Sequence, residues 1–143
     1  MGASFRRTQR VAWGETDSAG IVFYPNYFRW FDTATHELFR SIGLPLRELE
    51  QRGYLVPILS VSAEFRRSLR YDDEFTIDST VAEVEEKTFR VRHQVRSGEG
   101  KSLSEGTELR GWVGKGEDVP HLLSIPAEYR ELLTRGGHVA AHP

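Results

Sequence analysis

The chain has 143 residues, a formal net charge of −2 and a pI of about 6.2, so its bulk charge gives no sign of a nucleic-acid binder. Cysteine is absent, which excludes disulfides, cysteine catalysis and thiolate metal sites and agrees with a reducing compartment. No apolar stretch approaches the length of a membrane span, and the N-terminus lacks the apolar segment of a signal peptide, so we expect a soluble cytoplasmic protein.

The first elements expected along the chain are a short strand and a long helix. The strand is expected over Thr8–Trp13, followed by a loop over 14–24. From Pro25 or Asn26 to Ser41, apolar residues recur at steps of three and four and cover most of the circumference. This pattern predicts a helix that is enclosed by other elements. Gly43, with a proline two residues later, is expected to end it.

The second part of the chain changes to a period of two. A short helix is expected over Leu46–Arg52, ending at Gly53. Beyond it, apolar and polar residues alternate, which predicts half-buried strands with one apolar face. The expected strands cover 59–66, 75–81, 89–96 and 102–113. The inward face of the first of these strands is expected to hold Leu59, Val61, Ala63 and Phe65.

Several single residues in this region have expected structural roles. Gly106 and Gly111 are expected to mark bulges or close approaches in the last strand. Ser124 is a candidate cap for a short terminal helix that opens at Ile125. His93 alternates in phase with apolar neighbours, so we interpret it as a core histidine rather than a catalyst.

The order of elements predicts the fold class. A strand, one enclosed helix and four further antiparallel strands make an α+β fold, in which a five-stranded sheet wraps around one long central helix. One domain is expected over 1–143, with 136–143 as a loose tail. Such a sheet leaves strand edges and part of the helix uncovered, so we expect at least a dimer.

Asp17 carries the chemistry that the sequence suggests. It stands on a short loop with Gly20, just before the long helix, so its carboxylate is expected near the positive end of the helix dipole. Backbone N–H groups without an intrahelical partner lie at the same place. A carboxylate beside free donors suits attack on a carbonyl and stabilisation of the resulting oxyanion. On spacing alone, an ordinary turn or capping role for this aspartate is the commoner alternative.

The run Asp17-x-x-Gly20-Ile21-Val22-x-Tyr24-Pro25-Asn26-Tyr27-x-Arg29-Trp30-x-Asp32 resembles the 4-hydroxybenzoyl-CoA thioesterase family of hotdog-fold enzymes. It is similar to the branch whose catalytic carboxylate is an aspartate on the loop before the central helix. The resemblance extends over roughly residues 8–133. It implies a hotdog fold, dimers or tetramers, and hydrolysis of acyl-CoA to a free acid and CoA without metal or organic cofactor.

The resemblance also implies catalytic roles. Asp17 is the nucleophile or general base toward the thioester carbonyl, and whether it forms an acyl-enzyme anhydride or activates a water stays open. The backbone N–H of Tyr24 would donate to the thioester oxygen. Gly20 would let the loop fold tightly or let substrate come close, with an ordinary turn glycine as the alternative.

The acyl group is expected to lie along the helix. By resemblance, Asp32 lines the acyl pocket and accepts a hydrogen bond from a ring hydroxyl. The alternatives are a solvent-facing aspartate or an i,i+4 pair with His36. His36 is also a weak candidate for the acid/base residue of a hotdog dehydratase. The apolar walls are expected from residues that are otherwise more often plain core: Phe23, Tyr27, Trp30, Pro57, Ile58 and Leu59.

CoA phosphates require cations at the mouth of the site. The family contacts CoA where this chain has Lys87 and Thr88, and Arg90 and His121 are further candidates, although a solvated strand face is the commoner role. Glu85 and the residue after it are acidic where basic residues are expected, which leaves the mode of phosphate binding open. The five histidines form no close ligand pair, so no metal site is expected.

The expected function is therefore that of an acyl-CoA thioesterase. The favoured substrate is an aromatic or hydroxyaromatic acyl-CoA such as 4-hydroxybenzoyl-CoA, in the context of aromatic degradation. The enzymatic alternative is a short- or medium-chain aliphatic acyl-CoA thioesterase. The alternative from another class is a non-catalytic acyl-CoA binder or scaffold. The expected partners are the acyl-CoA and further copies of the chain, as a dimer or a dimer of dimers.

Overall fold

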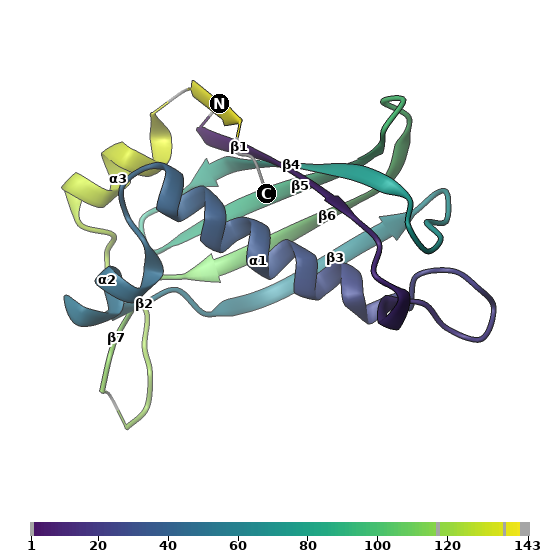
Figure 1. Ribbon diagram of the computed structural model, residues 1–143. Helices are drawn as coiled ribbons and strands as arrows, with labels where there is room; N and C mark the ends of the chain where they lie inside the picture. Colours follow the sequence, from purple (N-terminus) through teal and green to yellow (C-terminus); the bar gives the residue numbers. More distant parts are fainter. Residues whose placement is uncertain (1, 117, 136, 141–143) are drawn as a thin grey trace.

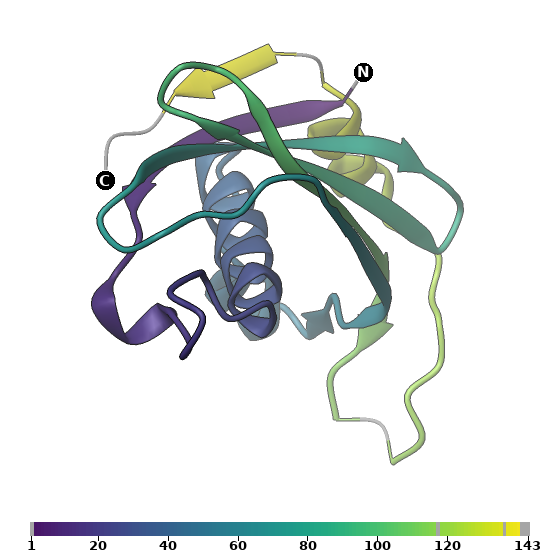
Figure 2. The same cartoon turned by 90° about the vertical axis from the view of Figure 1, so that its right-hand side faces the viewer.

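The computed structural model describes residues 2–116, 118–135 and 137–140. A curved sheet wraps around one long helix, α1 (Pro25–Ser41), as seen from two sides in Figure 1 and Figure 2. The predicted α+β architecture of five antiparallel strands around one helix is confirmed. In spatial order these strands are β3 (Ile58–Phe65), β6 (Ser102–Gly111), β5 (Thr88–Ser97), β4 (Glu74–Val84) and β1 (Ala3–Arg10).

Helix α1 has the bounds that its sequence pattern predicts. It begins at Pro25, where the missing N–H costs no intrahelical bond and the fixed φ suits a first turn. It ends at Ser41, and Gly43 then adopts a φ of 80°, a left-handed conformation that glycine tolerates best. The expected second helix is confirmed as α2 (Leu46–Gln51), again followed by a glycine with positive φ, Gly53.

The first strand differs from its predicted bounds. β1 covers Ala3–Arg10 instead of continuing to Trp13, and Trp13–Glu15 forms a 3-10 turn, η1. The reason is local: Glu15 Oε1 accepts the Ala12 N–H at 2.7 Å, which closes the chain into a turn before it can extend the ladder. The turn η1 leads directly into the Asp17 loop and so helps to position it.

A sixth strand lies where a loose tail was predicted. β8 (Gly137–Ala140) pairs parallel with β1, and Ala3 lies opposite Gly137. That part of the prediction is wrong, because the free edge of β1 offers unpaired backbone groups that the returning chain satisfies. Residues 136 and 141–143 lie outside the described part of the chain.

The end of the chain departs from prediction at two further points. The last long strand stops at Gly111, and the expected continuation forms a separate two-residue strand, β7 (Val113–Gly114), which pairs with β2 (Tyr54–Leu55). The terminal helix α3 (Ala127–Thr134) is capped by Pro126 without a side-chain hydrogen bond. The predicted capping role of Ser124 is therefore wrong, and its hydroxyl lies 3.5 Å from Glu86 Oε1 instead.

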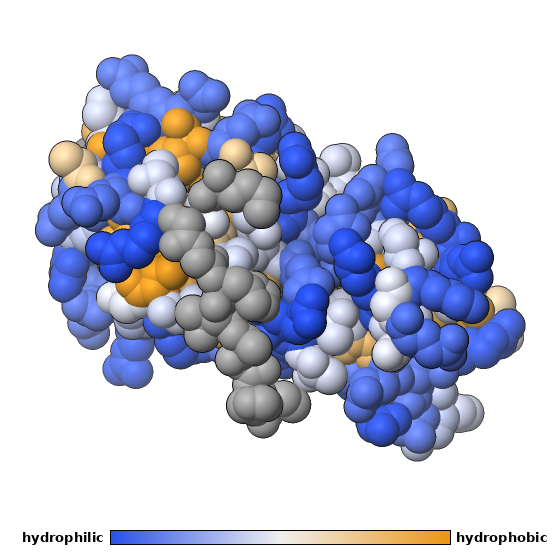
Figure 3. All heavy atoms as spheres, turned by 90° about the horizontal axis from the view of Figure 1, so that it is seen from above, coloured by the Kyte–Doolittle hydropathy of each residue, from blue (hydrophilic) through white to orange (hydrophobic). Residues whose placement is uncertain are grey.

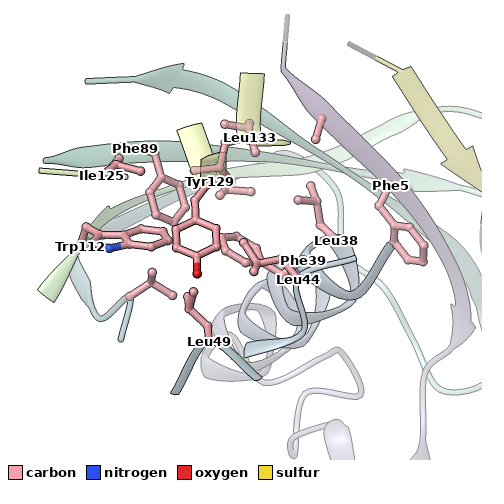
Figure 4. Packing of buried hydrophobic residues seen from close by; sticks show 14 residues of the cluster. Phe5, Leu38, Phe39, Leu44, Leu49, Phe89, Trp112, Ile125, Tyr129 and Leu133 are labelled. Atoms are coloured by element: carbon pink, nitrogen blue, oxygen red, sulfur yellow. The ribbon is translucent and has the colours of Figure 1, made fainter. Parts of the chain in front are cut away.

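The core fills the space between α1 and the concave face of the sheet in two clusters. Figure 4 shows the cluster at the α3 end, where the ring of Trp112 stacks on that of Tyr129 with centroids 5.3 Å apart. The second cluster lies nearer the start of α1 and includes Phe31. The predicted close approach at Gly106 is confirmed, because a Cβ at that position would overlap the Phe31 ring, so α1 lies directly against β6.

Strand β3 is the exception to the predicted burial. Its apolar residues were expected to face the core, but Leu59 is 48% exposed and Phe65 is 47% exposed. The physical reason is position, since β3 is the outer strand of the sheet and, within the described residues, pairs with a neighbouring strand, β6, on one side only. The side of the molecule over which β1 and β4 run is, by contrast, mostly hydrophilic, with small separated apolar patches (Figure 3). Across the described residues, no helix is long and apolar enough to cross a lipid bilayer.

Candidate active site

The Asp17 loop is a tight turn that Asp17 itself holds closed. The Asp17 N–H donates to the Ile21 carbonyl, and the Asp17 carbonyl accepts the Gly20 N–H, both at 2.9 Å. Gly20 takes a φ of 80°, which a residue with a Cβ adopts only at a cost. One carboxylate oxygen, Oδ1, accepts the Ala19 N–H at 2.9 Å. The turn-forming alternative is thus observed, and within the described chain Asp17 Oδ2 has no hydrogen-bond partner and stays available.

Glu15 fastens this loop to the first turns of α1. Its carbonyl accepts the Phe23 N–H at 2.8 Å and the Asn26 side-chain amide at 2.9 Å, while Oε2 accepts the Trp30 indole N–H at 2.8 Å. The sequence analysis gave Glu15 and Asn26 no role. Trp30 could have indicated the role of Glu15, because a buried indole N–H requires an acceptor from a neighbouring segment.

The start of α1 presents one free backbone donor. Pro25 has no N–H, and the N–H groups of Asn26 and Tyr27 donate to the carbonyls of Phe23 and Tyr24. The Tyr24 N–H has no acceptor among the residues that the structure describes. It lies at the positive end of the helix dipole and four residues after Gly20, where the Asp17 turn closes. This donor is the group expected to stabilise an oxyanion.

Tyr24 also lines a cavity of about 270 Å³. Tyr24 and Tyr27 form its helix side, and Phe65 with the two arginines that follow it, Arg66 and Arg67, forms its strand side. An aromatic wall with cations at its edge suits an apolar acyl group attached to an anionic carrier.

Of the predicted pocket walls, the two helix aromatics are buried and the others are exposed. Tyr27 lines the cavity and is 4% exposed, and its burial raises the pKa of its phenol, so this group stays protonated at neutral pH. Trp30 is 6% exposed and packs in the core beneath Tyr27, with ring centroids 5.1 Å apart. Phe23, Ile58 and Leu59 are exposed, so a single chain does not close them over the cavity.

Asp32 is paired at one oxygen and half exposed. Its Oδ1 accepts a hydrogen bond from Arg110 Nη2 at 2.8 Å and lies 3.7 Å from His36 Nε2, so the i,i+4 alternative is observed. The side chain is 49% exposed. Asp32 follows Tyr24 by eight residues, which places it about 12 Å further along the helix axis at 1.5 Å per residue.

Behind Asp32 lies a buried polar network that the sequence analysis missed. Glu108 and Arg110 alternate on β6 and look like a polar outer face, but they point inward and are 0% and 4% exposed. Thr35 Oγ1 donates to Glu108 Oε1 at 2.5 Å, and Arg110 Nε donates to the same oxygen at 3.1 Å. Burial raises the pKa of Glu108, but the bonds and charges of His93 and Arg110 outweigh it and hold that pKa below its usual range.

His93 is confirmed as a core histidine. It is fully buried, its ring stacks on Phe31 with centroids 4.7 Å apart, and Ser79 Oγ lies 2.7 Å from Nδ1. His93 Nε2 lies 3.4 Å from Thr35 Oγ1 and from Glu108 Oε1, and because Thr35 donates its only hydroxyl proton to Glu108, Nε2 is the donor in these contacts. Both ring nitrogens of His93 therefore contact buried side chains of the core.

The predicted CoA-binding residues lie at the other end of the sheet. Lys87 lies in the β4–β5 connection and Thr88 is the first residue of β5, at the end of the sheet opposite the Asp17 loop (Figure 1). Arg90 faces Glu83 at 3.4 Å, and His121 is exposed on the segment after β7. A single chain therefore does not bring these residues to Asp17.

A larger cavity, of about 510 Å³, lies at this same end, between α1, α2 and the segment that enters β3. Its lining includes His36, Arg40, Arg47 and Arg110, so it adjoins Asp32, which pairs with His36 and Arg110, and its lining includes no residue of the Asp17 turn. In the part of the chain that the structure describes, no three His, Asp or Glu side chains are grouped as a metal site would require.

Comparison with known proteins adds to this geometry. Residues 11–132 match the model of the Thioesterase-like superfamily. A 4-hydroxybenzoyl-CoA thioesterase from Pseudomonas sp. (strain CBS-3) is 34% identical over 139 residues, which cover 92% of this chain and 99% of that relative.

Two solved structures are similar over nearly the whole chain. One is an Asp-to-Asn mutant of 4-hydroxybenzoyl CoA thioesterase complexed with 4-hydroxybenzoyl CoA, with a TM-score of 0.84 at 34% identity, covering 92% of this chain and 99% of that one. The other is a gentisyl-coenzyme A thioesterase, with a TM-score of 0.79 at 32% identity, covering 87% of this chain and 98% of that one.

Proposed function

Because the chain belongs to the Thioesterase-like superfamily, and within it to the 4-hydroxybenzoyl-CoA thioesterase family, we propose that this acyl-CoA thioesterase hydrolyses aromatic and hydroxyaromatic acyl-CoA esters at Asp17. The observation that supports the proposal is that the loop leading into α1 carries both an Asp17 carboxylate oxygen and a Tyr24 N–H that have no hydrogen-bond partner among the described residues. These are the two groups that acyl transfer needs.

The chemistry follows from these two groups. The Asp17 carboxylate attacks the thioester carbon, a C–O bond forms, and the carbonyl oxygen takes the negative charge toward the Tyr24 N–H. The C–S bond then breaks and CoA leaves as a thiolate, which needs no strong general acid. Water hydrolyses the mixed anhydride to the carboxylic acid and restores Asp17. The alternative route, in which Asp17 takes a proton from an attacking water, uses the same donor and gives the same products.

The spacing of residues along α1 indicates the size of the acyl group. Tyr24, Phe28 and Asp32 follow one another at intervals of four residues and therefore share one stripe of α1. The separation of about 12 Å between the ends of this stripe suits one aromatic ring with a hydrogen bond at each end. The named acyl groups of the two relatives, 4-hydroxybenzoyl and gentisyl, are hydroxylated aromatic rings, which supports the same substrate class.

We propose that the working unit is at least a dimer, paired through the exposed edge of β3. An antiparallel pair of β3 strands about a two-fold axis would set the Ile58 end of one chain beside the Phe65 end of the other. The predicted wall at 57–59 and the predicted CoA contacts at 87–90 would then approach the Asp17 turn of the partner. Residues that remain apart within one chain would thus form one site.

The experiment that tests the function is a thiol-release assay with benzoyl-, 4-hydroxybenzoyl-, phenylacetyl- and aliphatic CoA esters. We expect kcat/KM to be highest for an aromatic ester. A preference for short aliphatic esters would contradict the aromatic assignment while leaving the thioesterase activity intact. Tight binding of CoA esters without release of thiol from any of them would favour the non-catalytic binder.

A further inference from the structure

Arg110 joins three segments of the chain through one buried guanidinium. It lies on β6 opposite Ile58, and its side chain is 4% exposed. Nη1 donates to the Val56 carbonyl at 2.9 Å, Nη2 donates to Asp32 Oδ1 at 2.8 Å, and Nε donates to Glu108 Oε1 at 3.1 Å. Because a guanidinium is planar and its donors point in fixed directions, these bonds set the position of the Asp32 carboxylate against the segment that enters β3.

Glu108 keeps this guanidinium in place from the inner side. Its Oε2 lies 3.3 Å from Arg110 Nη2, and its Oε1 also accepts the Thr35 hydroxyl at 2.5 Å. Glu108 is fully buried, so a rotation of the guanidinium away from it would leave a buried carboxylate without its cation. The Arg110 guanidinium is therefore held in one orientation, and its hydrogen bond to Asp32 fixes the position of the Asp32 carboxylate.

Asp32 uses only one of its two oxygens within the chain. Oδ1 is the oxygen that faces Arg110 and His36, whereas Oδ2 has no hydrogen-bond partner in residues 2–116, 118–135 and 137–140. A carboxylate fixed at one oxygen and half exposed presents the other as an acceptor in a defined direction. The ligand group that suits it is a neutral O–H or N–H donor, because an anionic group would be repelled.

We infer that Arg110 is a positioning residue that makes the acyl site selective for a hydroxylated ring, by holding the free oxygen of Asp32 where a ring hydroxyl can donate to it. The inference rests on the proposed hydrolysis of aromatic acyl-CoA esters. It assigns the selectivity to a buried residue on β6 that does not itself touch the substrate, acting through a half-exposed residue on α1.

The test is the ratio of kcat/KM for 4-hydroxybenzoyl-CoA to that for benzoyl-CoA. We expect Arg110→Met to lower this ratio about 10-fold or more, because a charge-assisted hydrogen bond to the hydroxyl loses its fixed acceptor. Asp32→Asn should lower it to a similar extent. In the Asp32→Asn background, Arg110→Met should have no further effect on the ratio, since both changes remove the same interaction.

Two controls separate positioning from general damage. Arg92→Met removes an exposed strand arginine on the neighbouring strand β5, and it should leave the ratio unchanged. If Arg110→Met does not fold, the double variant Glu108→Gln/Arg110→Met removes both buried charges together and carries the same expected loss. Calorimetric binding of 4-hydroxybenzoate and benzoate gives a second ratio that does not depend on turnover.

The outcomes distinguish this inference from the proposed function. A wild-type ratio near one, an unchanged ratio in a folded Arg110 variant, or independent effects of the Asp32 and Arg110 changes would each overturn the role of Arg110. Failure to release thiol from either ester would instead overturn the proposed hydrolysis, and the binding ratio would still report on Arg110.

Discussion

The two carboxylate oxygens of Asp17 differ in their hydrogen bonding. Oδ1 accepts the Ala19 N–H at 2.9 Å and so helps to shape the turn that carries it, while Oδ2 has no hydrogen-bond partner among the described residues. A turn aspartate and a catalytic aspartate were alternatives at the level of sequence, and the geometry allows one residue to be both. The Tyr24 N–H, which also lacks an acceptor within the described residues, lies on the same loop at the start of α1, and the proposed reaction uses both groups.

The lowered pKa of Glu108 predicts how the free energy of unfolding depends on pH. Its folded pKa lies below the ordinary value of 4.5, so its ionised form stabilises the fold above that pH, and this contribution is lost as the pH falls through the folded pKa. Glu108→Gln should therefore cost about 2 kcal/mol at neutral pH. Below pH 4.5 the difference between variant and wild type should shrink.

Urea unfolding of both proteins across this pH range measures that difference. Asp78→Asn, which changes an acid paired with Arg6 near the surface, is the control and should show a much smaller difference at neutral pH. A gap between Glu108→Gln and wild type that stays constant from neutral to acid pH would contradict the assigned ionised state of Glu108.

Among the elements, α1 and its preceding loop behave as one unit that Glu15 holds together. Glu15→Ala removes the acceptor of the Ala12 N–H and of the Trp30 indole N–H, which is then left buried and unpaired. We expect a loss of about 1–3 kcal/mol in the free energy of unfolding and a lower kcat, because the Asp17 turn loses its anchor.

Chemical denaturation and thiol-release kinetics check this expectation. Adding Trp30→Phe removes the orphaned indole donor, so the double variant Glu15→Ala/Trp30→Phe should lose less stability than the sum of the two single changes. Additive losses in stability, or an unchanged kcat in Glu15→Ala, would show that Glu15 does not anchor the loop.

The same elements show how far sequence reasoning extends. The bounds of α1 were predictable because its period, its first proline and Gly43 all give the same answer. The inward face of β6 could not be predicted, because two of its buried positions carry the charged residues Glu108 and Arg110. Charged residues in a strand ordinarily indicate the outward face. A buried ion pair can be recognised only when both partners and the covering helix are in place.

For the whole molecule, the outer strand β3 is the feature that remains incomplete. Alternation predicted an apolar inner face, yet Leu59 and Val61 are 48% and 39% exposed. Sequence indicated that these side chains need cover, but whether the cover comes from the same chain depends on strand order, which a pattern does not encode. An uncovered edge strand with apolar residues favours pairing with a second copy.

Val61→Asp should therefore convert the protein to monomers and abolish most of its activity, because a charge at the pairing edge opposes the composite site. Size-exclusion chromatography with light scattering, together with thiol release, measures both effects. Val119→Asp is the matched control, since Val119 is 78% exposed and lies outside the sheet. A wild-type chain that is monomeric and fully active would contradict the pairing.

The most direct test of the whole account is thiol release by Asp17→Asn. We expect the rate on the preferred aromatic ester to fall by about a thousandfold or more, while a non-hydrolysable analogue of that ester binds with little change in Kd. Asp73→Asn is the control, since Asp73 is another turn aspartate whose carboxylate accepts a backbone N–H, from Arg70 at 2.8 Å, and it should keep nearly the full rate. Hydrolysis by Asp17→Asn at the wild-type rate would show that the reaction takes place elsewhere.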